Sequence, residues 1–188
     1  MEMSPLPTRQ IPPIDFLNEC FDYNAATGSL TWKERPLNHF PKVASQRHFN
    51  KRYSGHEAGC KDPNGHVVLA ITYNGSKKIY FAHRVIWKIV TGENPPPIID
   101  HRDNNQSNNA WANLRAATMA QNSQNQHRRR GKELPKGVFR KRNTDRFYAQ
   151  IMANKKLLHL GTFASPEEAH EAYCRAARMA HGEFWRPI

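Results

Sequence analysis

The stretch IIDHRDNNQSNNAWANLRAATMAQNSQNQ, residues 98–126, decides the fold. It opens with two isoleucines followed by Asp100 and His101, a pattern typical of a short strand that ends in polar groups. An Asn-rich loop follows, and residues 114–117 predict a second short strand. A Thr-x-x-Gln capping box then predicts a helix that begins at Met119. The predicted local order is therefore strand, loop, strand and helix.

Four polar side chains in this stretch form the candidate catalytic set, namely Asp100, His101, Asn113 and Asn122. The last three stand 12 and 9 residues apart, at the end of the first strand, before the second strand and in the helix. This order and spacing resemble the HNH nuclease motif in its ββα-metal form, and in particular the zinc-free, phage-type homing endonucleases. The preceding sequence AHRVIWKIVTGENPPP, residues 82–97, is similar to the lead-in of that family.

The resemblance implies a role for each member of the set. A neutral histidine, with an ordinary pKa of ~6.5, can take a proton from water at neutral pH, so His101 is the expected general base. Asp100 and Asn122 are expected to bind one Mg²⁺ or Mn²⁺ ion, since hard oxygen donors suit such cations. No structural zinc is expected. Asn113 is expected to tie down the loop and orient His101. Without the resemblance, Asn113 and Asn122 would be interpreted as ordinary loop and helix-surface amides.

Positive charge is concentrated in one part of the chain. The 188 residues carry 28 Lys and Arg against 16 Asp and Glu, a formal net charge of +12. Residues 127–160 alone contain eleven basic and two acidic residues, a net +9. A basic excess of this size predicts binding to a polyanion, and double-stranded DNA is the expected partner. Arg128, Arg129 and Arg130 lie in this segment and are expected to contact DNA.

The C-terminal segment, residues 136–183, predicts three strands followed by a helix that begins after Ser165 and runs to about His181. Its sequences KGV, FYAQI, LGTF and PEEAHEAYCRAA resemble the ethylene-response-factor (Apetala-type) DNA-binding domain. The resemblance implies a three-stranded sheet in the major groove, backed by one helix. Strand alternation places Phe147 and Ile151 toward the helix. The residues expected to face DNA are Lys136, Arg140, Arg142, Arg146, Tyr148, Gln150 and His159.

The rest of the chain gives weaker patterns. Residues 1–13 are Pro-rich and predict a flexible N-terminus. Apolar spacing in residues 14–23 predicts a short amphipathic helix, whereas residues 36–56 show no clear pattern and predict a loop that could lie along a phosphate backbone. Asn74-Gly75 predicts a two-residue hairpin turn. His83, at the end of the second predicted hairpin strand, is interpreted as a structural residue near the site.

These patterns predict an α+β protein in two parts. A ββα-metal HNH nuclease domain spans residues 14–127, with its core motif at 83–127. A basic linker, residues 128–135, leads to a small three-stranded antiparallel sheet packed on one helix at residues 136–188.

Composition excludes several classes of protein. The three cysteines form no Cys-x-x-Cys pair, which argues against a zinc site built on cysteine and excludes a disulfide framework. No apolar run is long enough to span a membrane, and the N-terminus lacks the pattern of a secretory signal. We therefore expect a cytoplasmic protein without membrane contact, and a monomer.

The function expected from the sequence is a metal-dependent DNA endonuclease of the HNH class, directed to its substrate by the C-terminal sheet. One alternative is a non-catalytic, sequence-specific DNA-binding regulator that retains a relic nuclease fold. Another is a protein that binds or cleaves RNA, which is less expected because a sheet of this kind fits the B-form major groove and not the narrow A-form groove.

Overall fold

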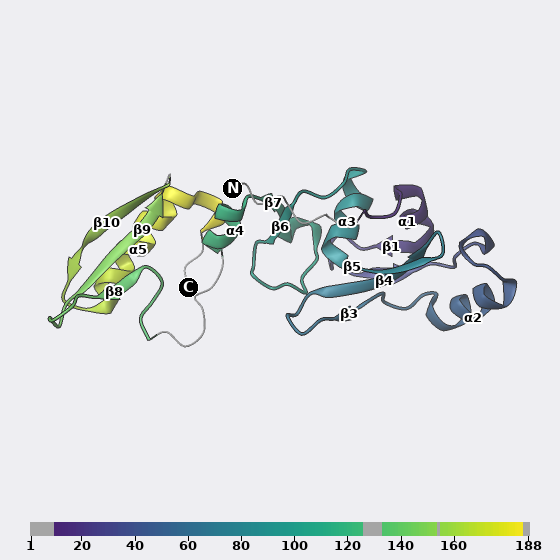
Figure 1. The fold of residues 1–188 in the computed structure, drawn as a ribbon, viewed down its shortest axis with the longest axis horizontal. Helices are drawn as coiled ribbons and strands as arrows, with labels where there is room; N and C mark the ends of the chain where they lie inside the picture. Colours follow the sequence, from purple (N-terminus) through teal and green to yellow (C-terminus); the bar gives the residue numbers. More distant parts are fainter. Residues whose placement is uncertain (1–9, 126–132, 154, 186–188) are drawn as a thin grey trace. The chain divides into compact units, whose positions relative to one another are not determined.

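The computed structural model describes residues 10–125, 133–153 and 155–185. The chain forms two compact units, residues 1–117 and 118–188, and each has its own hydrophobic core. Both units combine helices with small antiparallel sheets (Figure 1), as the α+β prediction required. The helix expected to complete the nuclease motif groups with the second unit, although the predicted nuclease domain extends to residue 127.

The first unit contains three α-helices, seven strands and two 3-10 helices in its described residues. In chain order they are α1 (Ile14–Cys20), β1 (Phe21–Tyr23), β2 (Leu30–Trp32), η1 (Leu37–His39), α2 (Val43–Tyr53), β3 (Cys60–Lys61), β4 (Val67–Tyr73), β5 (Ser76–Phe81), α3 (Ala82–Thr91), β6 (Ile98–His101), η2 (Trp111–Asn113) and β7 (Leu114–Ala117). The strands form a β1–β2 hairpin, a β3–β4–β5 sheet and a β6–β7 hairpin, all antiparallel.

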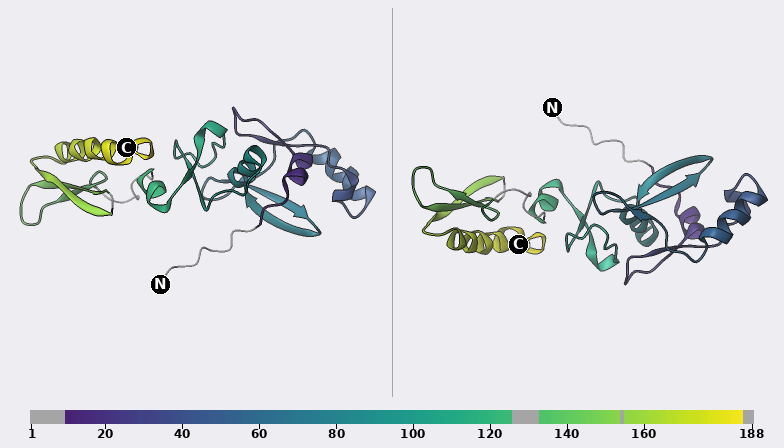
Figure 2. Two further views of the ribbon diagram at one scale, coloured as in Figure 1. Left: turned by 90° about the horizontal axis from the view of Figure 1, so that it is seen from above. Right: turned by 90° about the horizontal axis from the view of Figure 1, so that it is seen from below.

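The core of this unit lies between the β4–β5 hairpin and two helices. α3 packs on both strands, and α1 lies next to α3 (Figures 1 and 2). Leu69 and Ile71 alternate inward along β4, and Val85 and Ile86 come from α3, and all four side chains are fully buried. The turn between the strands is Asn74-Gly75, with φ of 48° and 72°, so the predicted two-residue turn is confirmed.

The predicted short helix is confirmed over Ile14–Cys20. Its predicted end at residue 23 is wrong, because residues 21–23 pair with β2 in the register Phe21↔Trp32. The loop predicted over residues 36–56 is also wrong, because this stretch contains the eleven-residue helix α2. Its sequence shows no apolar periodicity, and the contacts that hold it come from residues distant in the sequence.

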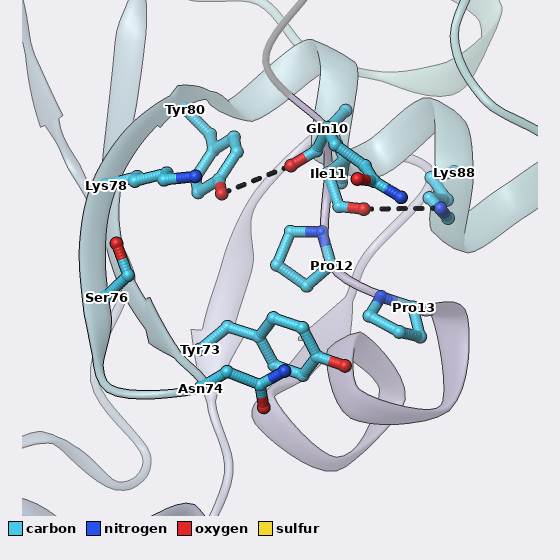
Figure 3. A pocket seen from close by; sticks show the side chains of 10 residues that line it. All are labelled: Gln10, Ile11, Pro12, Pro13, Tyr73, Asn74, Ser76, Lys78, Tyr80 and Lys88. Carbon is cyan, nitrogen blue, oxygen red and sulfur yellow. Dashed lines mark hydrogen bonds between the residues drawn. The ribbon is translucent and has the colours of Figure 1, made fainter.

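The N-terminal segment is tied to the first unit before residue 14. Ile11 is only 4% exposed, its backbone oxygen accepts a 3.4 Å hydrogen bond from Lys88, and Tyr80 donates a 3.3 Å bond to the backbone oxygen of Gln10. A pocket of about 580 Å³ lies between this segment and the β4–β5 turn (Figure 3). The packed chain therefore begins within the predicted flexible N-terminus, of which residues 1–9 lie outside the described residues.

The second unit contains the C-terminal sheet and its helix. Its described elements are α4 (Met119–Asn125), β8 (Val138–Arg140), β9 (Phe147–Ala153), β10 (Lys156–Phe163), α5 (Pro166–His181) and η3 (Gly182–Phe184). The antiparallel strand order is β10–β9–β8, and α5 packs on one face of this sheet (Figure 1). The three predicted strands and the helix are all present.

Side-chain alternation along β9 follows the prediction. Phe147, Ala149 and Ile151 are buried against α5, whereas Tyr148 and Gln150 are half-buried on the other face. α5 begins as predicted, because the Ser165 hydroxyl accepts a 3.2 Å hydrogen bond from the backbone N–H of Glu168. Small residues let α5 lie close to the sheet, because Ala169 and Ala177 are fully buried at the contact. Ala180, one turn nearer the end of the helix, is exposed. Within the described residues, no helix is long and apolar enough to cross a membrane.

Candidate active site

The β6–β7 hairpin places the predicted catalytic pair at the end of a buried strand. Ile99, Asp100 and His101 are all buried. The register pairs Asp100 with Arg115 and His101 with Leu114. The predicted strand–loop–strand order is confirmed, and the loop of residues 102–113 closes the hairpin.

Asp100 forms a buried ion pair across the hairpin. Oδ2 of Asp100 lies 2.8 Å from Nε and 2.7 Å from a terminal nitrogen of the Arg115 guanidinium. Both side chains are about 5% exposed. Sequence analysis missed Arg115, because its pairing with Asp100 depends on the strand register that the intervening loop sets. The guanidinium fixes the orientation of the carboxylate and compensates its charge in the interior.

Asn109 holds the ring of His101. The amide oxygen of Asn109 lies 3.2 Å from Nε2 of His101. A hydrogen bond to this oxygen requires the proton on Nε2, so the basic lone pair of the neutral ring lies on Nδ1. Burial lowers the pKa of His101, although the hydrogen bond that its ring donates to Asn109 acts in the opposite direction. The ring is therefore neutral at neutral pH. The prediction gave the orienting role to Asn113, but the side chain that contacts the ring is Asn109.

Asn113 bonds to two other residues of the loop, Asp103 and Asn108. Its side chain accepts a 3.0 Å hydrogen bond from the backbone N–H of Asp103, and it donates bonds of 2.9 Å to the Asp103 carboxylate and 2.7 Å to the backbone oxygen of Asn108. Burial raises the pKa of Asp103, but hydrogen bonds from Asn108, Asn105 and Asn113 outweigh it and leave the pKa below its ordinary value. Asp103 thus anchors the loop through its bonds with Asn105, Asn108 and Asn113.

The β1–β2 hairpin packs against the loop of residues 102–113. The Tyr23 hydroxyl donates a 2.9 Å hydrogen bond to the backbone oxygen of Asn109. The backbone N–H of Trp111 donates a 3.0 Å bond to the backbone oxygen of Ala25. At Gly28 a Cβ atom would lie 2.2 Å from the backbone of Asn109 and Ala110. Gly28 thus allows the β1–β2 turn to contact the backbone of Asn109, the residue that bonds to His101.

Two further histidines surround the ring of His101. The ring of His83 lies edge-on to it at 5.2 Å between centroids, and the ring of His66 lies at 6.3 Å. Burial, followed by the neighbouring histidines, lowers the pKa of His83 to about 3. His83 is buried, in agreement with its structural interpretation. His66 was not predicted as part of this group. Its backbone N–H donates a 2.9 Å hydrogen bond to Oδ1 of Asp62 in the preceding turn.

The fourth predicted residue, Asn122, lies in α4 and belongs to the second unit. The predicted capping box at the start of this helix is confirmed. The Thr118 hydroxyl accepts a 3.2 Å hydrogen bond from the N–H of Gln121, whose side chain accepts a 2.8 Å bond from the N–H of Thr118. Asn122 is half-buried and sits in the first turns of the helix, as expected. Its predicted role beside Asp100 stays a prediction.

The two predicted metal ligands, Asp100 and Asn122, both offer oxygen donors. Among residues 10–125, 133–153 and 155–185, no three His, Cys, Asp or Glu side chains are grouped to hold a metal ion. Asp100 supplies one carboxylate of fixed orientation, and Asn122 supplies an amide. Carboxylate and amide oxygens are each donors of the kind that a hard divalent cation binds.

Tyr148, Gln150 and His159 lie on the face of the C-terminal sheet away from its core. Arg140 does not share this face, because it pairs with the core residue Phe147 and its guanidinium lies 5.3 Å over that ring. Tyr148 is stacked on Phe139 at 5.3 Å and lies 5.8 Å from the ring of His159. Exposed arginines come from this sheet and from the turn after β8, namely Arg140, Arg142 and Arg146. Lys136 is half-buried, and burial lowers its pKa. The predicted phosphate contacts Arg128, Arg129 and Arg130 lie outside the described residues.

The pocket in Figure 3 is separate from the predicted catalytic set. Its lining comes from residues 10–13, the β4–β5 hairpin and Lys88, and includes none of the predicted site residues. Two of its polar side chains, Tyr80 and Lys88, bond to the backbone of the N-terminal segment, which itself forms one wall of the pocket.

Comparisons with known proteins agree with the motif. Residues 80–124 match a protein family described as HNH endonuclease. An uncharacterized HNH endonuclease of Acanthamoeba polyphaga mimivirus is 36% identical over 107 residues, which cover 56% of this chain and 55% of the viral protein. The chain thus spans about half the length of this curated relative. No solved structure matches. The domain match includes all four predicted catalytic residues and stops before the C-terminal sheet.

Proposed function

We propose that this protein is a metal-dependent endonuclease of the HNH class that hydrolyses phosphodiester bonds in double-stranded DNA. The observation that carries the proposal is the fixed imidazole of His101, held by Asn109 at 3.2 Å at the end of β6. It lies within the segment that matches HNH endonucleases. A buried, neutral imidazole whose second nitrogen is fixed by an amide is the arrangement that a general base requires.

His101 acts as the base that takes a proton from the attacking water at Nδ1. Asn109 keeps the Nε2 proton in place and thereby prevents the ring from presenting the wrong nitrogen. The lowered pKa of His101 keeps the ring in its basic form at neutral pH. Asn113 acts on His101 indirectly. Its side chain bonds to Asp103 and to the backbone of Asn108, and so fixes the loop that carries Asn109.

The residues that would hold one Mg²⁺ or Mn²⁺ ion are Asp100 and Asn122. A divalent ion supplies stabilisation of negative charge on the phosphate and on the leaving 3′ oxygen. Arg115 orients the Asp100 carboxylate through a single oxygen, Oδ2. The support for Asn122 is its spacing from His101 and its place inside the HNH match.

We also propose that the C-terminal sheet binds DNA and provides most of the affinity. The support is its sequence resemblance to the ethylene-response-factor domain, the net +9 of residues 127–160, and the exposed arginines Arg142 and Arg146 in the turn between β8 and β9. Arginine suits guanine edges and phosphates, and Gln150 on the same face suits adenine. Phe139, Met152 and Leu157 replace arginines of the plant domains, so no target sequence is carried over.

The test is a plasmid nicking assay on the full chain with Mg²⁺ or Mn²⁺. We expect the wild type to nick DNA and His101→Ala to lose at least about 100-fold in rate, as for removal of a general base. His56→Ala is the matched control, because His56 is exposed and its ring contacts only the Ser54 backbone among the described contacts. A wild-type protein that binds DNA but nicks it with neither ion would instead favour the non-catalytic regulator.

A further inference from the structure

Helix α2 is attached to the first unit through one face only. Gln46 and Asn50 each donate a 3.0 Å hydrogen bond to the backbone oxygen of Arg35, and Asn50 accepts one of 3.0 Å from the Arg35 N–H. Phe49 packs edge-on against Trp32, with 5.2 Å between ring centroids. These residues are spaced three and four apart, so they fix which face of the helix is turned outward.

The outward face of α2 is cationic. Arg47, His48, Lys51 and Arg52 are all exposed. No acidic residue occurs from residue 36 to residue 56. Across the described part of the chain, the ion pairs involve other residues, and none joins a carboxylate to the cations of this helix. The positive charge of this face is therefore not compensated by the described protein residues.

This charge pattern does not help the helix to form. Lys42 at the N-cap makes no side-chain capping bond, and the first turn contains no acidic residue. Arg47 and Lys51 are four residues apart, a spacing at which like charges repel by a few tenths of a kcal/mol. Only the cations in the last turn, Lys51 and Arg52, favour the helix through its dipole. The arrangement of cations is thus better explained by a partner than by helix stability.

We propose that the exposed face of α2, formed by Arg47, Lys51 and Arg52, binds the phosphate backbone of double-stranded DNA. The exposed large apolar side chains of α2, Val43 and Tyr53, stand at its two ends, and the residues between them present cations to solvent. Such a surface suits phosphates and lacks a central apolar anchor for a protein interface. The proposal rests on the proposed function, which makes DNA the substrate. Because α2 and His101 belong to the same compact unit, a duplex gripped by α2 is held by the unit that contains the proposed base.

The experiment measures binding of a 30-base-pair duplex by the full chain in EDTA, by fluorescence anisotropy at several salt concentrations. The test variant is Arg47→Gln/Lys51→Gln. The matched control is Lys33→Gln/Arg175→Gln, which removes two exposed cations that already pair with Asp22 at 3.6 Å and Glu171 at 3.8 Å. A third variant, Arg47→Lys/Lys51→Arg, retains both charges. Circular dichroism melting checks that all variants fold.

We expect the slope of log affinity against log salt to become shallower by about 1.8 in the test variant, because two phosphate contacts are lost. Its affinity at 0.1 M salt should fall roughly tenfold or more. The control pair and the charge-retaining pair should keep the wild-type slope. Equal slopes in the test and control variants would overturn the proposal, even if the wild type nicks plasmid DNA. A shallower slope in the test variant alone would support the proposal, even if the wild type does not nick DNA.

Discussion

The carboxylate of Asp100 and the guanidinium of Arg115 face each other across the β6–β7 hairpin, joined through Oδ2 at 2.7 and 2.8 Å. The pair is buried, so neither charge is well solvated. Each charge is therefore stabilised in the interior mainly by the other. The same carboxylate is the proposed metal ligand, which links the stability of the hairpin to the geometry of the proposed site.

Arg115→Met should destabilise the first unit by about 3–5 kcal/mol, because it leaves a buried carboxylate without its guanidinium. Asp100→Asn/Arg115→Met should recover much of this loss, since the double variant removes both charges. The measurement is urea unfolding followed by tryptophan fluorescence, to which Trp32, Trp87 and Trp111 of this unit contribute. Equal losses in the single and double variants would show that the ion pair is not the cause.

Asn109→Ala should reduce the rate of DNA cleavage about 10- to 100-fold, because the ring of His101 loses the group that fixes its orientation. Asn109 acts through His101, so kcat should fall while KM stays near the wild-type value. Asn38→Ala, an exposed asparagine outside the site, should cleave at the wild-type rate. A change confined to KM would place Asn109 in substrate binding instead.

Much of the fold was predictable because its signals are local. The Asn74-Gly75 turn, the Thr118 capping box and the Ser165 cap each depend on a few adjacent residues, and the structure shows all three. The strand–loop–strand order around Asp100 and His101 followed from a short apolar run and from motif spacing.

The parts that were missed depend on contacts between distant residues. α2 has no apolar periodicity and is held by the backbone of Arg35, which lies eleven and fifteen residues before its two amide partners, Gln46 and Asn50. The Asp100–Arg115 pair needs the strand register, and His66 reaches His101 only because the β4–β5 sheet and α3 fold together. None of these relationships leaves a signal within one stretch of sequence.

Acid should destabilise the protein through His83. Its pKa is about 3 in the folded state, chiefly because of burial, against ~6.5 when unfolded. As the pH falls below 6.5, the unfolded chain gains a proton that the folded chain does not, so the free energy of unfolding decreases until the pH reaches about 3. Between pH 6.5 and pH 5 this residue should cost about 2 kcal/mol.

The check compares urea unfolding of the wild type and His83→Gln at pH 7 and pH 5. The variant should be less stable at pH 7, because it loses ring packing, yet it should lose about 2 kcal/mol less than the wild type on acidification. His56→Gln, at an exposed site, should keep the wild-type response. The same acid sensitivity in all three proteins would assign it to other groups.

Gly28→Ala should impair both stability and cleavage, because the new methyl group collides with the backbone that carries Asn109. At this position φ is +80°, and a Cβ would lie 2.2 Å from backbone atoms of Asn109 and Ala110. Gly75→Ala is the matched control, since its φ is +72° and nothing lies within 4 Å of the added atom. Both variants carry the strain of a left-handed residue, about 1–2 kcal/mol. Gly28→Ala alone should lose more than this and also slow DNA cleavage, as measured by thermal melting and plasmid nicking. If the two variants melt and cleave alike, the β1–β2 hairpin does not support the loop that holds His101.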